Sequence, residues 1–505
     1  MKKKKIVFEV VVVIFGLLTL LAATGAVHDL FYFVSTAVVC LLFGLYYVIY
    51  IKTREENDLW KIYPLFALLL GAAFMFAKPT YMTPDEPIHL YKTYSISNEL
   101  MGIDNGSSIK MRSDDYLAQE IGIVSTMQYE EVNKIREAYN KNYYAISDFF
   151  CNNEELIDLG REPLQYDSYM YIIPAIGLTI GRVLSLGTVP TYMLGTVFNV
   201  FLFIVLFSAS IYITPVAKEV FFTIGLMPIV FQQCVSFSCD AFLIPVGAFT
   251  IALYYCILNK IEKNEATVKE LILWFVTMML IVPAKRFLCF PLLVFPLVLL
   301  YKSRNIRLKR IIIIGFIFTV AIICVYSYIH FQGKDFVAAP FSPEMTFSIT
   351  YILTHPLEII KMLINTITFR GTDYLMGFLG TNPGWMNFRI PTFLSVSYVL
   401  VIFIVLICND NFFSNKLRIV VDCVFIALMA VIFAGMLLGW TSKENIVIEG
   451  VQGRYLVIPL LLLLSNINIK NIKCDSNIMY KMRYALPMLD IFYIIYIYAY
   501  VGGGF

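Results

Sequence analysis

Residues 311–330 read IIIIGFIFTVAIICVYSYIH, an apolar run that contains no Asp, Glu, Lys or Arg. About 20 such residues are enough for a helix to cross the hydrocarbon core of a bilayer. The residues just before the run, 302–310, read KSRNIRLKR. Because positive residues beside a span favour the cytoplasmic side, this stretch predicts a helix that enters the membrane from the cytoplasm.

Runs of this kind recur along the whole chain. Of the 505 residues, 59% are hydrophobic and 15% are charged, whereas soluble proteins average about half and a quarter. We therefore predict an all-α fold, a polytopic membrane helix bundle with about 13 transmembrane helices. The candidate spans are residues 6–27, 30–51, 62–77, 168–186, 190–213, 217–236, 240–259, 270–283, 287–301, 311–330, 392–408, 418–439, 454–465 and 484–500.

Clusters of basic residues orient these spans. They lie at residues 2–5, 52–54, 302–310, 416–418 and 470–483. They predict a multi-pass protein of the plasma membrane with a cytoplasmic N-terminus. Loops 78–167, 331–390 and 440–453 then face outward, and the first is expected to be long and helical. The net charge of +3 gives no reason to expect a nucleic-acid partner.

Segment 217–236 is the exception among the candidate spans. Six full crossings between the first outer loop and residues 302–310 would leave that basic stretch outside, so one candidate must not cross fully. The segment contains Gly225, Pro228 and several polar side chains, which are tolerated at membrane depth only inside protein or beside a wet cavity. We expect it to dip in and return, which places Asp240 on the outer side.

Three parts are predicted along the chain. Residues 1–61 hold two N-terminal spans, of which the first resembles a signal peptide but is interpreted as retained because a second apolar run follows. Residues 62–465 form the catalytic core with its outer loops, and residues 466–505 form a cytoplasmic loop and the last span. The ten cysteines and four histidines are scattered, which excludes a disulfide framework and a His-rich metal cluster.

The stretch TPDEPIH, which begins at Thr83, places two carboxylates and an imidazole at a membrane edge. A structural interpretation is a capping box with Thr83 as N-cap, Pro84 at the first helical position and Glu86 at N3. A functional interpretation is that Asp85, Glu86 and His89 gather on one face of the helix. A helix start needs one acidic residue, so the additional carboxylate and the His favour a catalytic role.

Three further charged residues are candidates because of their apolar surroundings. Asp240 stands between two long apolar runs, where an ionisable group is a functional candidate, although an interfacial turn would also explain it. Lys285 and Arg286 interrupt apolar sequence on the outer side, against the usual bias of positive residues. A lipid phosphate is a suitable outer partner for both, and snorkelling at a helix end is the alternative.

The sequence GVQGRY, which begins at Gly450, opens a span on the outer side. Gly453 allows close approach of a second backbone, and Arg454 directs a guanidinium to the interface. Tyr455 is assigned to the phosphate of a lipid donor together with Arg454, although anchoring in an aromatic belt also explains it. Gln452 is assigned to the substrate.

A Gly-rich outer loop contains Trp385, which is expected to stack on a sugar. Together these groups bring carboxylates and cations to one face of the membrane. A carboxylate there serves as general base for an acceptor hydroxyl, or holds a divalent cation. Cations stabilise the charge of a phosphate leaving group. No Asp-x-Asp metal motif is present, so no metal ligand is assigned and the cofactor is left open.

The motifs Pro-Asp-Glu-x-x-His at Pro84, Ser-Cys-Asp ending at Asp240, Lys285 and Gln-Gly-Arg-Tyr at Gln452 occur in this order over about residues 62–465. This combination resembles a family of bacterial multi-spanning proteins described only as predicted membrane proteins. That family looks like a branch of the GT-C glycosyltransferases, integral membrane enzymes that use lipid-phosphate sugars.

The resemblance implies that Asp85 or Glu86 matches the acidic residue of the first outer loop, which is the catalytic base or a metal ligand in such enzymes. Asp240 matches a further outer-face Asp that shapes the site. The chain differs from the usual pattern in having two extra N-terminal spans.

The expected function is transfer of a sugar from a polyprenyl-phosphate donor to a cell-envelope glycan, lipid or protein acceptor on the outer face. The expected partners are therefore that donor, the acceptor and membrane lipids. Two alternatives stay open: a transporter or flippase for a lipid-linked oligosaccharide, and an envelope polysaccharide polymerase or ligase. A transporter would favour internal repeats and charges at mid-membrane, whereas a polymerase differs mainly in its acceptor.

Overall fold

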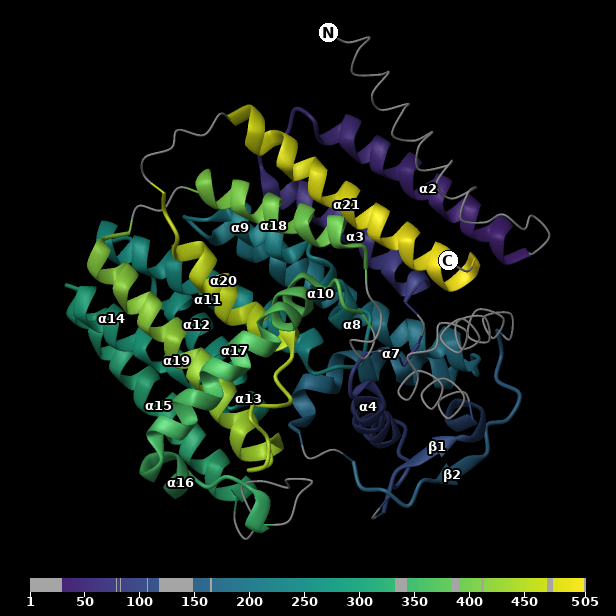
Figure 1. The fold of residues 1–505 in the computed structure, drawn as a ribbon, viewed down its shortest axis with the longest axis horizontal. Helices are drawn as coiled ribbons and strands as arrows, with labels where there is room; N and C mark the ends of the chain where they lie inside the picture. Colours follow the sequence, from purple (N-terminus) through teal and green to yellow (C-terminus); the bar gives the residue numbers. More distant parts are fainter. Residues whose placement is uncertain are drawn as a thin grey trace.

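Helices form most of the structure, a computed structural model that describes residues 30–78, 80–81, 83–106, 108–117, 149–163, 166–331, 343–383, 390–409, 413–469 and 476–503 (Figure 1). The predicted first span, 6–27, and Trp385 lie outside these residues.

The elements follow one another as predicted for a helical bundle, with one small sheet. In the first half of the chain they are α2 (Leu30–Thr53), α3 (Leu59–Ala77), α4 (Glu86–Leu100), β1 (Lys110–Arg112), β2 (Leu156–Asp158), η1 (Ser168–Tyr171), α7 (Ile172–Val183), α8 (Thr188–Ile213), α9 (Lys218–Gly225), α10 (Pro228–Cys234) and α11 (Asp240–Lys263). In the second half they are α12 (Val268–Ile281), α13 (Ala284–Phe287), η2 (Phe290–Val294), α14 (Phe295–Lys302), α15 (Ile306–Phe331), η3 (Pro343–Met345), α16 (Ile349–Thr354), α17 (Pro356–Leu379), α18 (Thr392–Ile407), α19 (Asn415–Trp440), η4 (Gly453–Leu456), α20 (Val457–Asn466) and α21 (Ser476–Gly503).

Within the described residues, five helices are long and apolar enough to cross a membrane: Leu59–Ala77, Thr188–Ile213, Asp240–Lys263, Ile306–Ile329 and Asn415–Trp440. Shorter apolar helices accompany them at Cys40–Thr53, Phe290–Lys302, Thr392–Ile407 and Gly453–Asn466. The protein is therefore a multi-pass membrane protein, and the predicted class of fold, a membrane helix bundle, agrees with the structure.

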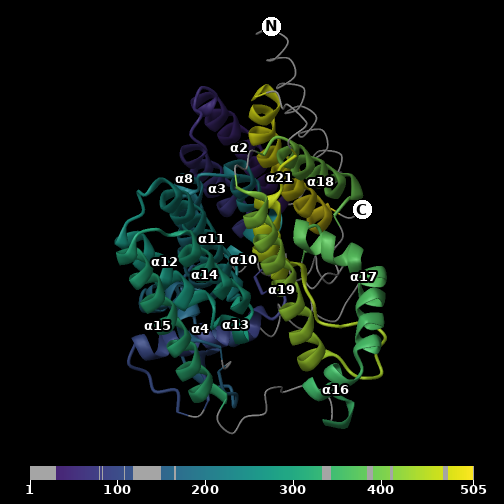
Figure 2. The ribbon, with the colours of Figure 1, turned by 90° about the vertical axis from the view of Figure 1, so that its left-hand side faces the viewer.

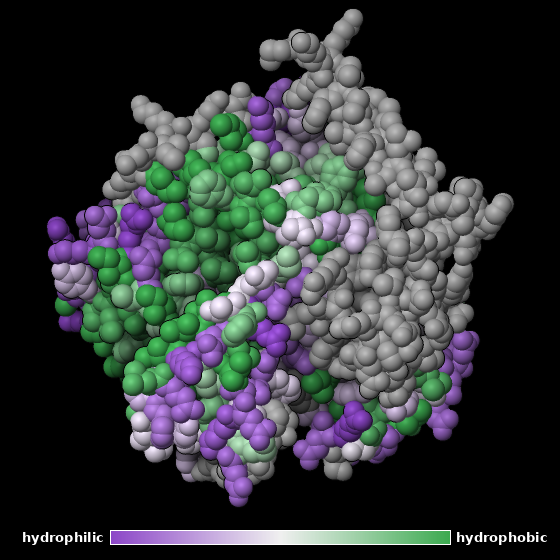
Figure 3. All heavy atoms as spheres, viewed as in Figure 1, coloured by the Kyte–Doolittle hydropathy of each residue, from purple (hydrophilic) through white to green (hydrophobic). Residues whose placement is uncertain are grey.

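Apolar side chains cover much of the outside as well as the core. Ile314 on α15 and Ile426 on α19 are 66% and 63% exposed, as expected of helices that face lipid rather than water. Figure 3 shows hydrophobic residues over the middle of one face and hydrophilic residues at its left and lower edges. By contrast, α11 lies at the centre of the bundle, where 89% of its apolar window is buried.

Segment 217–236 is broken into α9 and α10, which are 8 and 7 residues long. At 1.5 Å per residue each spans about 12 Å or less, far short of a bilayer core. Every residue from Val220 to Ala248 is buried. The polar side chains of this segment are therefore enclosed by protein, which is the condition under which such a segment is tolerated at membrane depth.

The outer loop predicted at 331–390 is not a simple loop, because it contains α16 and the 24-residue α17. Figure 2 shows α17 beside α19, with α15 on the other side of α19. Tyr374 of α17 packs edge-on against Phe433 of α19, with ring centroids 6.0 Å apart. The first outer loop also differs from the prediction, since besides α4 it carries the antiparallel pair β1–β2, in which Met111 pairs with Ile157.

Candidate functional site

The turn before α4 presents Asp85 in a left-handed conformation, with φ +63°. α4 begins at Glu86 rather than at Pro84, so the predicted capping box is wrong in its detail. The Thr83 hydroxyl does not cap the helix but accepts a hydrogen bond from Lys78 Nζ at 2.7 Å. Only half of the box forms, because the Glu86 carboxylate accepts the Thr83 N–H at 3.0 Å.

Glu86 points away from Asp85, into the protein. Its side chain is fully buried and pairs with Lys78 Nζ at 3.0 Å. The Tyr192 hydroxyl donates a hydrogen bond to the same carboxylate, and the Phe237 N–H donates to it at 3.3 Å. Glu86 therefore anchors the turn that carries Asp85. It was predicted to act beside Asp85 and His89, but unlike them it does not line the cavity between these elements.

Asp85 meets Arg454 from the far end of the chain. Arg454 Nη2 lies 2.7 Å from Asp85 Oδ2, and Arg454 Nη1 donates to the Pro84 carbonyl at 2.8 Å. The Arg454 side chain is 4% exposed, whereas that of Asp85 is 33% exposed. The guanidinium is thus held in the protein wall while the carboxylate keeps access to solvent.

Asp240 lies at the N-terminus of α11 and does not line the cavity. Its Oδ1 accepts a hydrogen bond from Lys285 Nζ at 2.6 Å, and its Oδ2 lies 3.4 Å from Arg454 Nε. Asp240 was predicted to orient an acceptor or a cation, and in the structure its carboxylate contacts two protein cations. Asp240 fixes the positions of Lys285 and Arg454.

Lys285, Arg286 and Phe287 form a left-handed turn, with φ of 48°, 56° and 68°. Such conformations cost about 1–3 kcal/mol each in residues other than glycine, so the surrounding contacts must hold them. Lys285 is held by Asp240 and lies 4.5 Å from the centre of the Tyr455 ring. Burial lowers the pKa of Lys285, but the Asp240 carboxylate outweighs this and raises the pKa above its usual value. Arg286 is exposed and does not line the cavity.

His89 follows Asp85 one turn later and is buried. Its Nδ1 lies 2.7 Å from the Tyr171 hydroxyl, and its ring stacks on Tyr166. Burial, with the nearby cations Arg454 and Lys285, lowers the pKa of His89 to about 3. The imidazole is consequently neutral near pH 7 and can donate or accept a hydrogen bond without adding charge.

Gly453 confirms the predicted close approach of two backbones. A Cβ at this position would lie 2.1 Å from the carbonyl carbon of Gly377, so no side chain fits. This contact joins α17 to the segment that carries Arg454.

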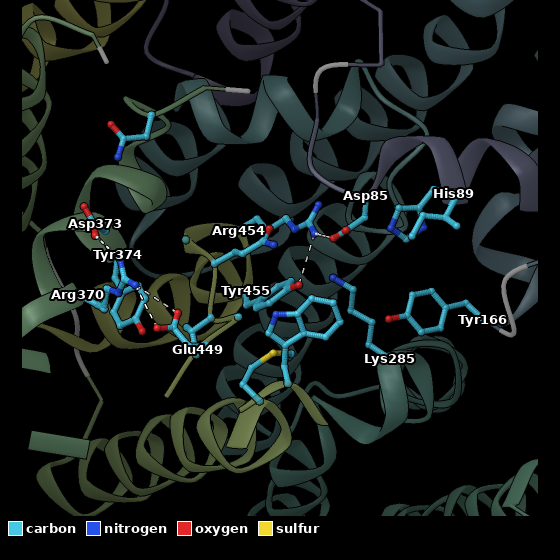
Figure 4. A pocket seen from close by; sticks show the side chains of 18 residues that line it. Asp85, His89, Tyr166, Lys285, Arg370, Asp373, Tyr374, Glu449, Arg454 and Tyr455 are labelled. Carbon is cyan, nitrogen blue, oxygen red and sulfur yellow. Dashed lines mark hydrogen bonds and ion pairs between the residues drawn. The ribbon is translucent and has the colours of Figure 1, made fainter. Parts of the chain in front are cut away.

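A cavity of about 700 Å³ lies between these elements (Figure 4). Its lining includes six of the predicted residues: Asp85, His89, Lys285, Gln452, Arg454 and Tyr455. Gly453, which was predicted to allow the close approach of two backbones, also lines the cavity. No role was predicted for the other lining residues: Ile88, Tyr166, Arg370, Asp373, Tyr374, Asn382, Met436, Trp440, Glu449, Gly450 and Val451.

Two groups of charged residues stand apart in Figure 4. We call the group of Asp85, His89, Tyr166, Lys285, Arg454 and Tyr455 the Arg454 end, and the group of Arg370, Asp373, Tyr374 and Glu449 the Arg370 end. On α17, Asp373 and Tyr374 follow Arg370 by three and four residues. That spacing was the signal available in the sequence, and it was missed because the segment was interpreted as a loop.

Metal ligands are not grouped at this site. In the part of the chain that the structure describes, no three His, Cys, Asp or Glu side chains lie close enough to hold a metal ion. The two carboxylates near the Arg454 end each contact a protein cation instead.

The sequence pattern of the DUF2142 family, described as predicted membrane proteins, matches residues 68–464. This range includes α4, η4 and every residue placed at the cavity. No curated protein and no solved structure matches the chain.

Proposed function

We propose that this chain, which belongs to the DUF2142 family of predicted membrane proteins, is a membrane glycosyltransferase. It transfers a sugar from a polyprenyl-phosphate donor to a cell-envelope acceptor on the outer face of the plasma membrane. The observation that supports this proposal is the arrangement of Asp85, which is open to the cavity, beside the almost buried cations Lys285 and Arg454.

In the proposed reaction, an acceptor hydroxyl attacks the anomeric carbon of the donor sugar. A bond forms between the acceptor oxygen and that carbon, and the bond from the carbon to the phosphate oxygen breaks. The hydroxyl proton passes to the Asp85 carboxylate, and polyprenyl phosphate leaves with the bonding electron pair. Asp85 is the only one of the three predicted acidic residues that lines the cavity, so it is the base in this scheme.

The cations act on the leaving group. Lys285 Nζ and the Arg454 guanidinium are fixed by Asp240 before substrate arrives, so they need little reorganisation when negative charge develops on the phosphate. Tyr455 lies under both cations, 4.5 Å from Lys285 Nζ and 5.3 Å from the Arg454 guanidinium carbon. His89, being neutral, is suited to orient a hydroxyl rather than to balance charge.

Asp85→Asn tests the proposal. The purified protein in lipid vesicles is given a panel of radiolabelled undecaprenyl-phosphate sugars together with an envelope extract as acceptor. Loss of the base should lower the transfer rate about 10²–10⁴-fold, while the protein keeps its thermal unfolding midpoint within a few degrees. Glu99→Gln, an exposed change on α4, the helix that follows Asp85, is the matched control. Transfer by Asp85→Asn at the rate of the control would refute the assignment.

A further inference from the structure

The Arg370 end of the cavity has a different chemistry from the Arg454 end. Arg370 Nη2 lies 3.1 Å from Glu449 Oε1, and Arg370 Nη1 lies 3.8 Å from Asp373 Oδ2. These side chains are between 35% and 46% exposed, so water or a ligand can reach them. α17 supplies Arg370 and Asp373, while Glu449 comes from the segment between α19 and η4.

Formal charge separates the two ends. One guanidinium faces two carboxylates at the Arg370 end, which gives a net charge of −1. At the Arg454 end two cations meet Asp85 and Asp240, which gives a net charge of zero. A phosphate group is therefore repelled from the Arg370 end relative to the Arg454 end. A ligand at the Arg370 end should carry no negative charge.

An aromatic surface lies beside Glu449. Trp440 lines the cavity and is 54% exposed. Its indole packs against Gly450, the residue after Glu449: a Cβ there would lie 2.5 Å from Trp440 Cδ1, and the backbone has φ +83°. Glycine at this position therefore lets the indole approach the backbone closely. The cavity thus offers a large apolar ring face next to hydrogen-bond acceptors.

Asn382 adds an acceptor that the described residues leave unused. It lines the same cavity, and its Oδ1 is buried without a hydrogen-bond partner among them. A buried acceptor of this kind is costly unless a ligand or water donates to it. Carboxylate and amide oxygens beside an aromatic face match a ring that has hydroxyl donors at its edge and C–H groups on its face.

We infer that the Arg370 end and Trp440 form a subsite for an uncharged carbohydrate, which is the acceptor. The role of this carbohydrate as acceptor rests on the proposed function, whereas the existence of a carbohydrate-binding site does not. The sugar ring lies on the Trp440 indole, and its hydroxyls donate to Glu449, Asp373 and Asn382. One cavity thus holds the phosphate of the donor at the Arg454 end and the acceptor sugar toward the Arg370 end.

Saturation-transfer NMR on the full chain in lipid nanodiscs tests the subsite. The probes are the methyl glycosides of glucose, galactose, mannose and N-acetylglucosamine, with glucose 1-phosphate as an anionic comparison. We expect at least one neutral glycoside to receive saturation through its ring protons. Glu449→Gln should weaken its binding about tenfold or more, because hydrogen bonds to a charged acceptor are the strong ones.

The controls separate this subsite from a general effect on folding. Glu444→Gln, an exposed change in the same segment, should leave binding unchanged. Trp440→Ala should abolish the signal, whereas Trp440→Phe, which keeps an aromatic face, should retain part of it. The inference is overturned if no neutral glycoside binds, or if Glu444→Gln weakens binding as much as Glu449→Gln does.

Asp85→Asn separates the subsite from the proposed function. This variant should bind the neutral glycoside as the unaltered protein does. If binding depends on Glu449 and Trp440 but no transfer depends on Asp85, the subsite stands and the glycosyltransferase proposal fails. If transfer depends on Asp85 while Glu449→Gln leaves both glycoside binding and the acceptor KM unchanged, the subsite fails and the proposed function stands.

Discussion

Two adjacent carboxylates, Asp85 and Glu86, have opposite surroundings. Asp85 is open to the cavity, and Glu86 is fully buried against Lys78. Residue types alone predicted an acidic pair with a His one turn later, and Asp85 and His89 do lie together at the cavity. The inward turn of Glu86 was not predictable, because it depends on the left-handed conformation of Asp85 and on a Tyr from α8.

Glu86→Gln should destabilise the protein strongly. The change leaves the Lys78 ammonium, whose side chain is 8% exposed, without its charged partner. Breaking a buried pair in this way costs about 3–5 kcal/mol. Thermal unfolding in detergent should show a clearly lower midpoint for this variant, and the Glu99→Gln variant should match the unaltered protein.

A double variant tests whether the loss of stability comes from the unpaired charge of Lys78. Lys78→Met together with Glu86→Gln removes the stranded charge and should recover part of the lost stability. An unchanged midpoint in the single variant would show that the pair does not hold the Asp85 turn.

His89 should make the protein less stable as the pH falls. Its pKa in the folded protein is about 3, lowered mainly by burial and further by Arg454 and Lys285, against about 6.5 in an unfolded chain. Between these two pKa values the unfolded state binds more protons than the folded state does. Each unit by which the pH is lowered in this range therefore reduces the free energy of unfolding by up to about 1.4 kcal/mol through His89. Above pH 6.5 the contribution of His89 is constant.

Unfolding midpoints measured between pH 7 and pH 4.5 test this dependence. The His89→Gln variant should lose less stability over that range than the unaltered protein does. His355→Gln alters an exposed histidine and should leave the pH dependence as it is. An equal dependence of the unfolding midpoint on pH in all three proteins would contradict the effect of burial on the pKa of His89.

At the scale of elements, α17 is the helix that sequence reasoning did not foresee. Lys361, Arg370 and Asp373 interrupt its hydropathy, so a search for long apolar runs passes over it. Its apolar side chains are nonetheless periodic: Leu357, Ile360, Ile364 and Ile367 recur at intervals of three and four and are 52–81% exposed. By contrast, the long spans were predictable, because their signal is composition over about 20 residues.

We predict that this exposed stripe of α17 contacts the bilayer. An amphipathic helix with an apolar stripe and a polar face lies along a membrane surface. Single cysteines at Leu357 and Ile364, in a background without other cysteines, can be labelled with a fluorophore in vesicles. Lipids that carry a quencher should reduce the emission of both.

Labels on the polar face provide the matched comparison. Glu358→Cys and Thr372→Cys, both exposed and turned further from the apolar stripe, should respond to an aqueous quencher and much less to the lipid-borne one. Equal responses on both faces, or an oligomeric state that shields the stripe from lipid, would contradict the prediction.

At the scale of the whole molecule, the site unites four separate regions of the chain. Asp85 lies just before α4, and Asp240 begins α11. Lys285 lies in the left-handed turn of α13, and Arg454 lies in η4. The orientation of the spans, inferred from clusters of basic residues, predicted that these residues share one membrane face. The structure brings them into direct contact. The pairing itself, carboxylate with cation, was not predictable, because the sequence does not show how far each group stands from the others.

The contact between Asp85 and Arg454 joins residues 369 positions apart, and this has a consequence for how the protein is made. At about 5–20 residues per second, ribosomes need roughly 20–75 s to add that length of chain. During this interval the turn at Asp85 has been synthesised without its guanidinium partner. A nascent chain that stalls before Glu449 also lacks the wall from Glu449 to Tyr455. The cavity is therefore complete only after the chain has been synthesised past Tyr455, so a product truncated before that residue lacks part of its wall.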